Sequence, residues 1–139
     1  MVFSGMNHLA VLIAAVASWL FGAIWYGALG KQWMAALGKT KDELAPSGRP
    51  NPVIFIVSFI AQLIMAEMLA GLIGHLGVGQ FTVKNAVISA AFVWFGFVLT
   101  VLVTNHGFQN AKRALTFIDG GHWLGVLMVQ ALVLGWFGV

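Results

Sequence analysis

Four long apolar segments dominate the pattern of hydrophobic and polar positions along the chain. Each holds about 20 or more mostly apolar residues, which matches the ~30 Å hydrocarbon core of a bilayer at ~1.5 Å of helix rise per residue. Helices are expected, because lipid cannot satisfy free backbone polar groups. The sequence therefore predicts an all-α, polytopic membrane protein with four transmembrane helices in a bundle, at about Met6–Leu29, Pro52–Leu76, Thr82–His106 and Phe117–Phe137.

Composition supports this class and excludes others. Of the 139 residues, 60% are apolar and only 8% are charged, whereas soluble domains carry roughly 25% charged residues. We expect one transmembrane domain over residues 1–139, surrounded by membrane lipids. The chain has no cysteine, so thiol chemistry and thiolate metal sites are excluded. No basic helix face or recognition motif indicates a nucleic-acid partner, and no cofactor is expected.

The basic residues predict the orientation. Six of them fall in the polar loop 30–51 and in the loop after the third segment, and one falls on the other side: Lys31, Lys39, Lys41, Arg49, Lys112 and Arg113 against Lys84. Loops rich in Lys and Arg stay in the cytoplasm. Both loops should therefore be cytoplasmic and both termini should face out.

Two local patterns stand out at the cytoplasmic boundary. Trp25, Tyr26, Trp33 and Phe108 cluster there, and amphipathic rings prefer the headgroup level. Within the polar loop, Thr40 is followed three residues later by Glu43, the spacing of a helix capping box. The sequence thus predicts aromatic anchors and one short loop helix.

Glu67 is a carboxylate within the second apolar segment. A charged side chain near the centre of a bilayer costs at least ~3 kcal/mol, so it is a candidate functional residue. Counting turns from the cytoplasmic boundary places Gln130 at a similar depth, which predicts that the two side chains pair. Glu67 then either takes part in proton- or cation-linked chemistry, or stays protonated as a structural anchor.

Polar residues share one face of the fourth segment. Asp119, His122 and Gln130 follow helical spacing, and Asn105 and His106 should reach the level of Asp119 from the third segment. This cytoplasmic-side cluster either fixes the helix ends by hydrogen bonds or handles protons or ions. Two histidines and one aspartate on different elements do not form a specific metal signature, so no metal site is expected.

Small residues three or four positions apart predict where helices pack closely. They lie on three segments: Ala14, Ser18 and Gly22 on the first, Gly71 and Gly74 on the second, and Gly121 and Gly125 on the fourth.

Several aromatic and glycine motifs resemble a known family. They are Trp25-Tyr26-Gly27, Lys31-x-Trp33-Met34, Asn105, Phe108 and Asp119-Gly120-Gly121. On these positions the chain is similar to short bacterial membrane proteins catalogued as domain of unknown function seventeen-sixty-one. The resemblance implies a four-helix architecture in the bacterial cytoplasmic (inner) membrane, without an assigned chemistry.

Two functions of different classes remain open. No catalytic motif of the soluble type is present, so the protein is not expected to be an enzyme. In the first interpretation it is a homo-oligomeric bundle that gives proton- or cation-linked passage or binding of a small solute around Glu67. In the second it is a non-enzymatic scaffold or an accessory subunit of a larger membrane complex, with Glu67 as a hydrogen-bonded anchor.

Overall fold

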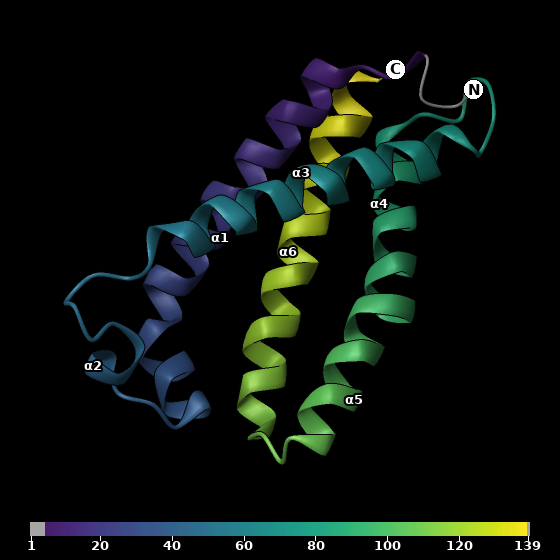
Figure 1. The fold of residues 1–139 in the computed structure, drawn as a ribbon. Coiled ribbons are helices and arrows are strands. Elements are labelled where there is room, and N and C mark those ends of the chain that lie inside the picture. The colour runs from purple at the N-terminus through teal and green to yellow at the C-terminus, as the bar shows by residue number, and fades with distance from the viewer. Residues whose placement is uncertain (1–4, 139) are drawn as a thin grey trace.

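The computed structural model describes residues 5–138, and every regular element among them is helical. The four long helices are each long and apolar enough to cross a membrane, which confirms the predicted fold class. The first long helix starts and the last one finishes at the same end of the bundle, the terminal end, whereas the short helix α2 (Lys41–Leu44) lies at the other, the loop end (Figure 1). In chain order the elements are α1 (His8–Leu37), α2 (Lys41–Leu44), α3 (Pro52–Gly74), α4 (Val83–Val93), η2 (Trp94–Leu99), α5 (Thr100–Phe108) and α6 (Arg113–Phe137).

Helix α1 is longer than the apolar pattern predicted, because it continues eight residues into the expected loop. Its 30 residues correspond to about 45 Å, more than a hydrocarbon core requires. The Asn7 side chain accepts a hydrogen bond from the backbone of Ala10 at the first turn, and Gly38 ends the helix in the left-handed conformation (φ 73°). The capping box of Thr40 and Glu43 is confirmed at the start of α2.

The other helix starts follow from local chemistry. Asn51 caps α3 through its side chain, and Pro52 occupies the first turn, where a missing N–H group costs nothing. Thr82 caps α4 in the same way. Helix α6 begins at Arg113, four residues before the predicted start at Phe117, because its first turn lies at the polar loop end.

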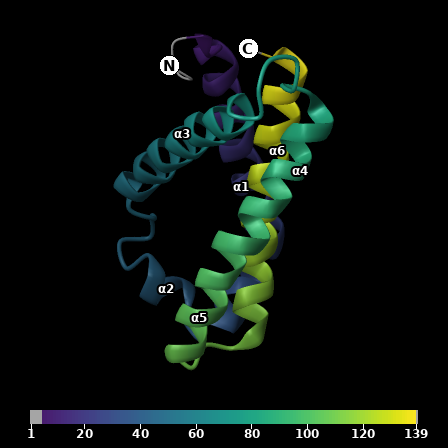
Figure 2. The ribbon, with the colours of Figure 1, turned by 90° about the vertical axis from the view of Figure 1, so that its right-hand side faces the viewer.

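Helix α6 is central. It packs against α1 on one side and against the third span, formed by α4, η2 and α5, on the other. Helix α3 crosses α1 and α6 at a steep angle, and its first half leans away from α5 (Figures 1 and 2). The buried residues of α3 begin at Gln62, whereas residues 53–57 are exposed on every side. Close packing is therefore concentrated in the half of the bundle nearer the terminal end.

Small residues make this packing possible. The predicted seam of Ala14, Ser18 and Gly22 is buried along α1. Buried alanines of the other three spans belong to the same core as Ala14: Ala66 and Ala70, Ala86 and Ala90, and Ala131. Side chains of this size let helices approach closely, and close contact is the main source of attraction between helices in lipid.

Gly121 and Gly125 of α6 receive aromatic rings rather than helix backbones. A Cβ atom at Gly121 would lie 2.8 Å from the ring of Trp25, and one at Gly125 would overlap the ring of Phe21. The small-residue pair predicted at these positions is thus an intramolecular contact between α6 and α1. In α3, Gly71 is buried and Gly74 is half-buried.

The third span contains a turn that the sequence pattern did not predict. Residues Trp94–Leu99 adopt π-helical geometry, which inserts the equivalent of one extra residue into an α-helix. Within this turn the indole N–H of Trp94 donates to the backbone carbonyl of Gly120 at 2.8 Å. The wide turn is therefore fixed to α6 at its first residue.

We expect Gly135→Ala to lower the stability of the fold. The added Cβ would lie 2.6 Å from the backbone Cα of Val83, which cannot move without shifting α4, so the cost should be about 1–3 kcal/mol. The same change at Gly107, where nothing lies within 4 Å, should be neutral or stabilise the helix by up to about 1 kcal/mol. Thermal unfolding followed by circular dichroism in detergent compares the two; equal midpoints would contradict the expectation.

Candidate functional site

A buried polar network joins α1, α3 and α6 where they cross. The hydroxyl of Ser18 lies 2.8 Å from Oε1 of Gln62, and the side-chain amide of Gln130 donates to the Ser18 hydroxyl at 3.0 Å. The same amide donates to the backbone carbonyl of Gln62 at 2.9 Å. All three side chains are buried. Hydrogen bonds of this kind fix the relative register of three helices, because buried polar groups in a membrane-spanning region cannot exchange their protein partners for water.

The predicted pairing of Glu67 with Gln130 is wrong. The Glu67 carboxylate instead lies 3.5 Å from Nδ1 of His8, the first residue of α1. Counting turns assumed upright helices, but α3 is strongly inclined (Figure 1), so equal counts do not give equal heights. Gln62, five residues earlier, occupies the level of Gln130, and Glu67 lies nearer the terminal end.

A second polar cluster lies towards the loop end. The Tyr26 hydroxyl donates to Oδ1 of Asp119 at 2.7 Å. His106 has Nε2 at 3.8 Å from Oδ2 of Asp119 and Nδ1 at 2.8 Å from the hydroxyl of Thr116. The structure thus brings together His106 and Asp119 of the predicted cluster, and adds Tyr26 and Thr116.

The other two members of the predicted cluster lie elsewhere. Asn105 is exposed on α5. His122 is buried, and its ring packs against Tyr26 with 4.8 Å between ring centroids. A Cβ at Gly22 would lie 2.8 Å from Nε2 of His122, so only glycine leaves room for this ring. Within residues 5–138, no group of three His, Asp or Glu side chains is placed to hold a metal ion.

Trp25 and Tyr26, which the sequence predicted to be headgroup anchors, both make polar contacts with α6. Besides the Tyr26 contact with Asp119, the indole N–H of Trp25 donates to the backbone carbonyl of Ile118 at 3.0 Å. Both residues lie on the same stripe of α1 as Ser18 and Gly22, at i+7 and i+8 from Ser18. This spacing was a signal for inward-facing rings.

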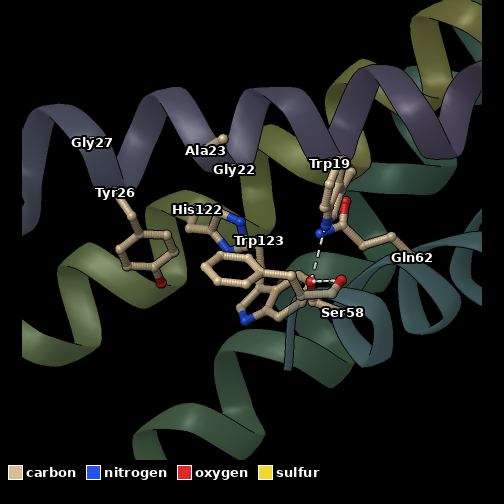
Figure 3. A pocket seen from close by; sticks show the side chains of 10 residues that line it. Trp19, Gly22, Ala23, Tyr26, Gly27, Ser58, Gln62, His122 and Trp123 are labelled. Atoms are coloured by element: carbon tan, nitrogen blue, oxygen red, sulfur yellow. Dashed lines mark hydrogen bonds between the residues drawn. The ribbon is translucent and has the colours of Figure 1, made fainter. Parts of the chain in front are cut away.

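A cavity of about 600 Å³ lies between α1, α3 and α6. Cavities of roughly 300–1,000 Å³ with mainly apolar walls and a few polar groups are typical of small-molecule sites. Within residues 5–138, four Trp, Tyr or Phe rings and no Asp, Glu, Lys or Arg line it; the residues are Trp19, Gly22, Ala23, Tyr26, Gly27, Phe55, Ser58, Gln62, His122 and Trp123. Figure 3 shows Trp19 and Tyr26 of α1 and His122 and Trp123 of α6 extending into the same space as Ser58 of α3.

Among the described residues, some polar groups at the cavity wall have hydrogen-bond partners and one does not. The indole N–H of Trp19 donates to the hydroxyl of Ser58 at 3.0 Å, which in turn donates to the carbonyl of Phe55 at 2.8 Å. By contrast, Nδ1 of His122 is buried and has no hydrogen-bond partner in the described part of the chain. Such a group is rare in a folded interior and requires an explanation.

Sequence reasoning missed most of this wall. Gln62 lies in the same apolar segment as Glu67, and only the charged residue was predicted to be functional. Trp19, Ser58 and Trp123 belong to no motif. The signal for Gln62 was available: an amide within an apolar span is costly unless it has a partner, and Gln130 was such a partner.

The helices, the buried network and the lateral cavity together define a small four-span integral membrane protein. The chain belongs to the family described as Protein of unknown function (DUF1761), whose model matches residues 9–135, and this confirms the resemblance seen in the sequence. No curated protein and no solved structure matches the chain.

A double-mutant cycle should confirm the observed partners of Gln130. Gln130→Leu combined with Ser18→Ala should show a coupling free energy of about 0.5–1 kcal/mol, because each change removes the same hydrogen bond. Gln130→Leu combined with Glu67→Gln is the matched control, and its two changes should add within about 0.5 kcal/mol. Unfolding in detergent measures both. Coupling in the control cycle alone would restore the pairing predicted from depth.

Proposed function

We propose that this protein binds a small, mainly apolar solute from the membrane in the cavity between α1, α3 and α6, without catalysing a reaction. The observation that carries this proposal is the cavity itself: about 600 Å³ with four aromatic rings in its wall. The unpartnered Nδ1 of His122 supports it, since a bound polar group would satisfy that atom.

The inclination of α3 supports entry from the side. Its first ten residues, 52–61, include no buried residue, and Phe55, which lines the cavity, is 49% exposed. Ala23 and Gly27 of α1 line the opposite wall and are also exposed. A solute dissolved in lipid therefore has a route into the cavity between α1 and α3 that avoids the closely packed half of the bundle.

Filling the cavity should abolish binding. Ala23→Leu adds three carbon atoms to the wall without removing a polar group, and Ala28→Leu makes the same change at an exposed position of α1 that does not line the cavity. The probe is N-phenyl-1-naphthylamine, a neutral aromatic molecule, detected by saturable energy transfer from tryptophan in purified protein. Ala23→Leu should weaken binding by about tenfold or more and Ala28→Leu by less than about twofold. Equal affinities in both variants would refute the cavity as the binding site.

Proton- or cation-linked passage around Glu67 in a homo-oligomer is a further part of the proposal. The Glu67 side chain is 27% exposed and the His8 side chain beside it is 66% exposed, so this pair of titratable groups is open to a facing copy. In the alternative, the protein is a scaffold or accessory subunit, and Glu67 only anchors the start of α1 to α3. The apolar residues 53–57, exposed all round the helix, favour the alternative because they offer a surface to a second copy or a larger complex.

Flux measurements separate the two roles of Glu67. In proteoliposomes loaded with a pH-sensitive dye, Glu67→Gln should abolish proton-linked flux if the carboxylate carries it, since glutamine has the same shape and cannot release a proton. Glu43→Gln, the same change in the loop, is the control and should leave flux intact. Flux that persists in Glu67→Gln would assign Glu67 to the anchor role and leave the cavity proposal untouched.

A further inference from the structure

We infer that the solute taken up by this cavity is a hydrophobic organic cation, held by the aromatic wall and by the negative charge of Asp119 behind Tyr26. This inference rests on the proposed binding function and names its ligand class.

The charged groups around the cavity favour a positively charged ligand. No Lys or Arg among the described residues lines it, so no permanent positive charge in the wall repels a cation. The carboxylate of Asp119 stands one hydrogen bond behind the wall, because the ring of Tyr26 lines the cavity and its hydroxyl donates to Asp119 at 2.7 Å. At low dielectric a carboxylate acts over longer distances than in water.

No Lys or Arg in the described part of the chain forms an ion pair with the Asp119 carboxylate. In the described chain its only basic neighbour within 4.0 Å is His106, whose Nε2 lies 3.8 Å away. Lys112 is engaged elsewhere, since its ammonium group donates to the backbone carbonyl of Ala35 at 3.0 Å. Arg113 is exposed and lies on a separate surface hollow. The negative charge is therefore available to a ligand.

The aromatic rings in the cavity wall also favour a cation. The faces of aromatic rings carry partial negative charge and attract cations, most strongly for tryptophan. Two of the four rings are indoles, Trp19 and Trp123. Tyr26 adds to this, because donating a hydrogen bond to a carboxylate polarises the phenol and draws negative charge towards its ring. An anion would meet only repulsion from these groups, and a neutral solute would gain nothing from Asp119.

The test uses two ions of nearly the same shape and opposite charge, tetraphenylphosphonium and tetraphenylborate. Isothermal titration into the purified full chain at low salt, with empty detergent as the blank, should show the phosphonium binding about tenfold or more tightly than the borate. Asp119→Asn should weaken phosphonium binding by about tenfold and change N-phenyl-1-naphthylamine binding by less than about twofold. Asp42→Asn, the same change in α2, is the control and should alter neither.

The outcomes separate this inference from the proposed function. If wild-type protein binds both ions equally, or if Asp119→Asn leaves phosphonium binding unchanged, the cation assignment is overturned while the cavity proposal stands on the Ala23→Leu result. If Ala23→Leu affects no probe, both are overturned. Should Asp119→Asn fail to fold, the affinities of wild-type protein and Asp119→Glu for the two ions decide the question. Glutamate keeps the negative charge, so Asp119→Glu must still bind the phosphonium more tightly than the borate.

Discussion

The hydrogen bonds among Ser18, Gln62 and Gln130 are the constraint on which the rest of the structure depends. They lie where α1, α3 and α6 cross, and a buried amide in an apolar surrounding leaves its helices little freedom to slide or rotate. On the terminal side of this point, small residues let the helices pack closely. On the loop side α3 departs from the bundle, and the cavity occupies the space between the diverging helices. This buried network thus lies at the boundary between a closely packed half of the bundle and an open half.

The sequence predicted what depends on the chain's own periodicity. The four spans, the capping box at Thr40 and the buried seam of Ala14, Ser18 and Gly22 follow from spacing alone. The proximity of His106 and Asp119 followed from their shared level near the polar loops. The partner of Glu67 could not be predicted, because it depends on the inclination of α3, a property of several helices together that no single segment encodes.

The direction of the tryptophan side chains was equally hard to predict. Trp19, Trp25 and Trp94 each donate an indole hydrogen bond across a helix interface, yet a tryptophan near the end of a membrane span is as compatible with the headgroup layer as with the interior. What decides is the partner: α6 offers backbone carbonyls to Trp25 and Trp94, and α3 offers the Ser58 hydroxyl to Trp19. Aromatic residues at such positions should therefore be interpreted together with the small residues of the helices that face them.

The π-helical turn at Trp94–Leu99 has a consequence for how the third span is organised. A π-helical turn takes up one additional residue within the turn itself, so the α4 and α5 halves face α6 as they would in an unbroken α-helix that is one residue shorter. Ala86 and Ala90 of α4 meet the closely packed half, whereas α5 turns His106 towards Thr116 and Asp119. A one-residue deletion in this turn would therefore restore an unbroken α-helix and leave both the α4 alanines and His106 of α5 facing α6.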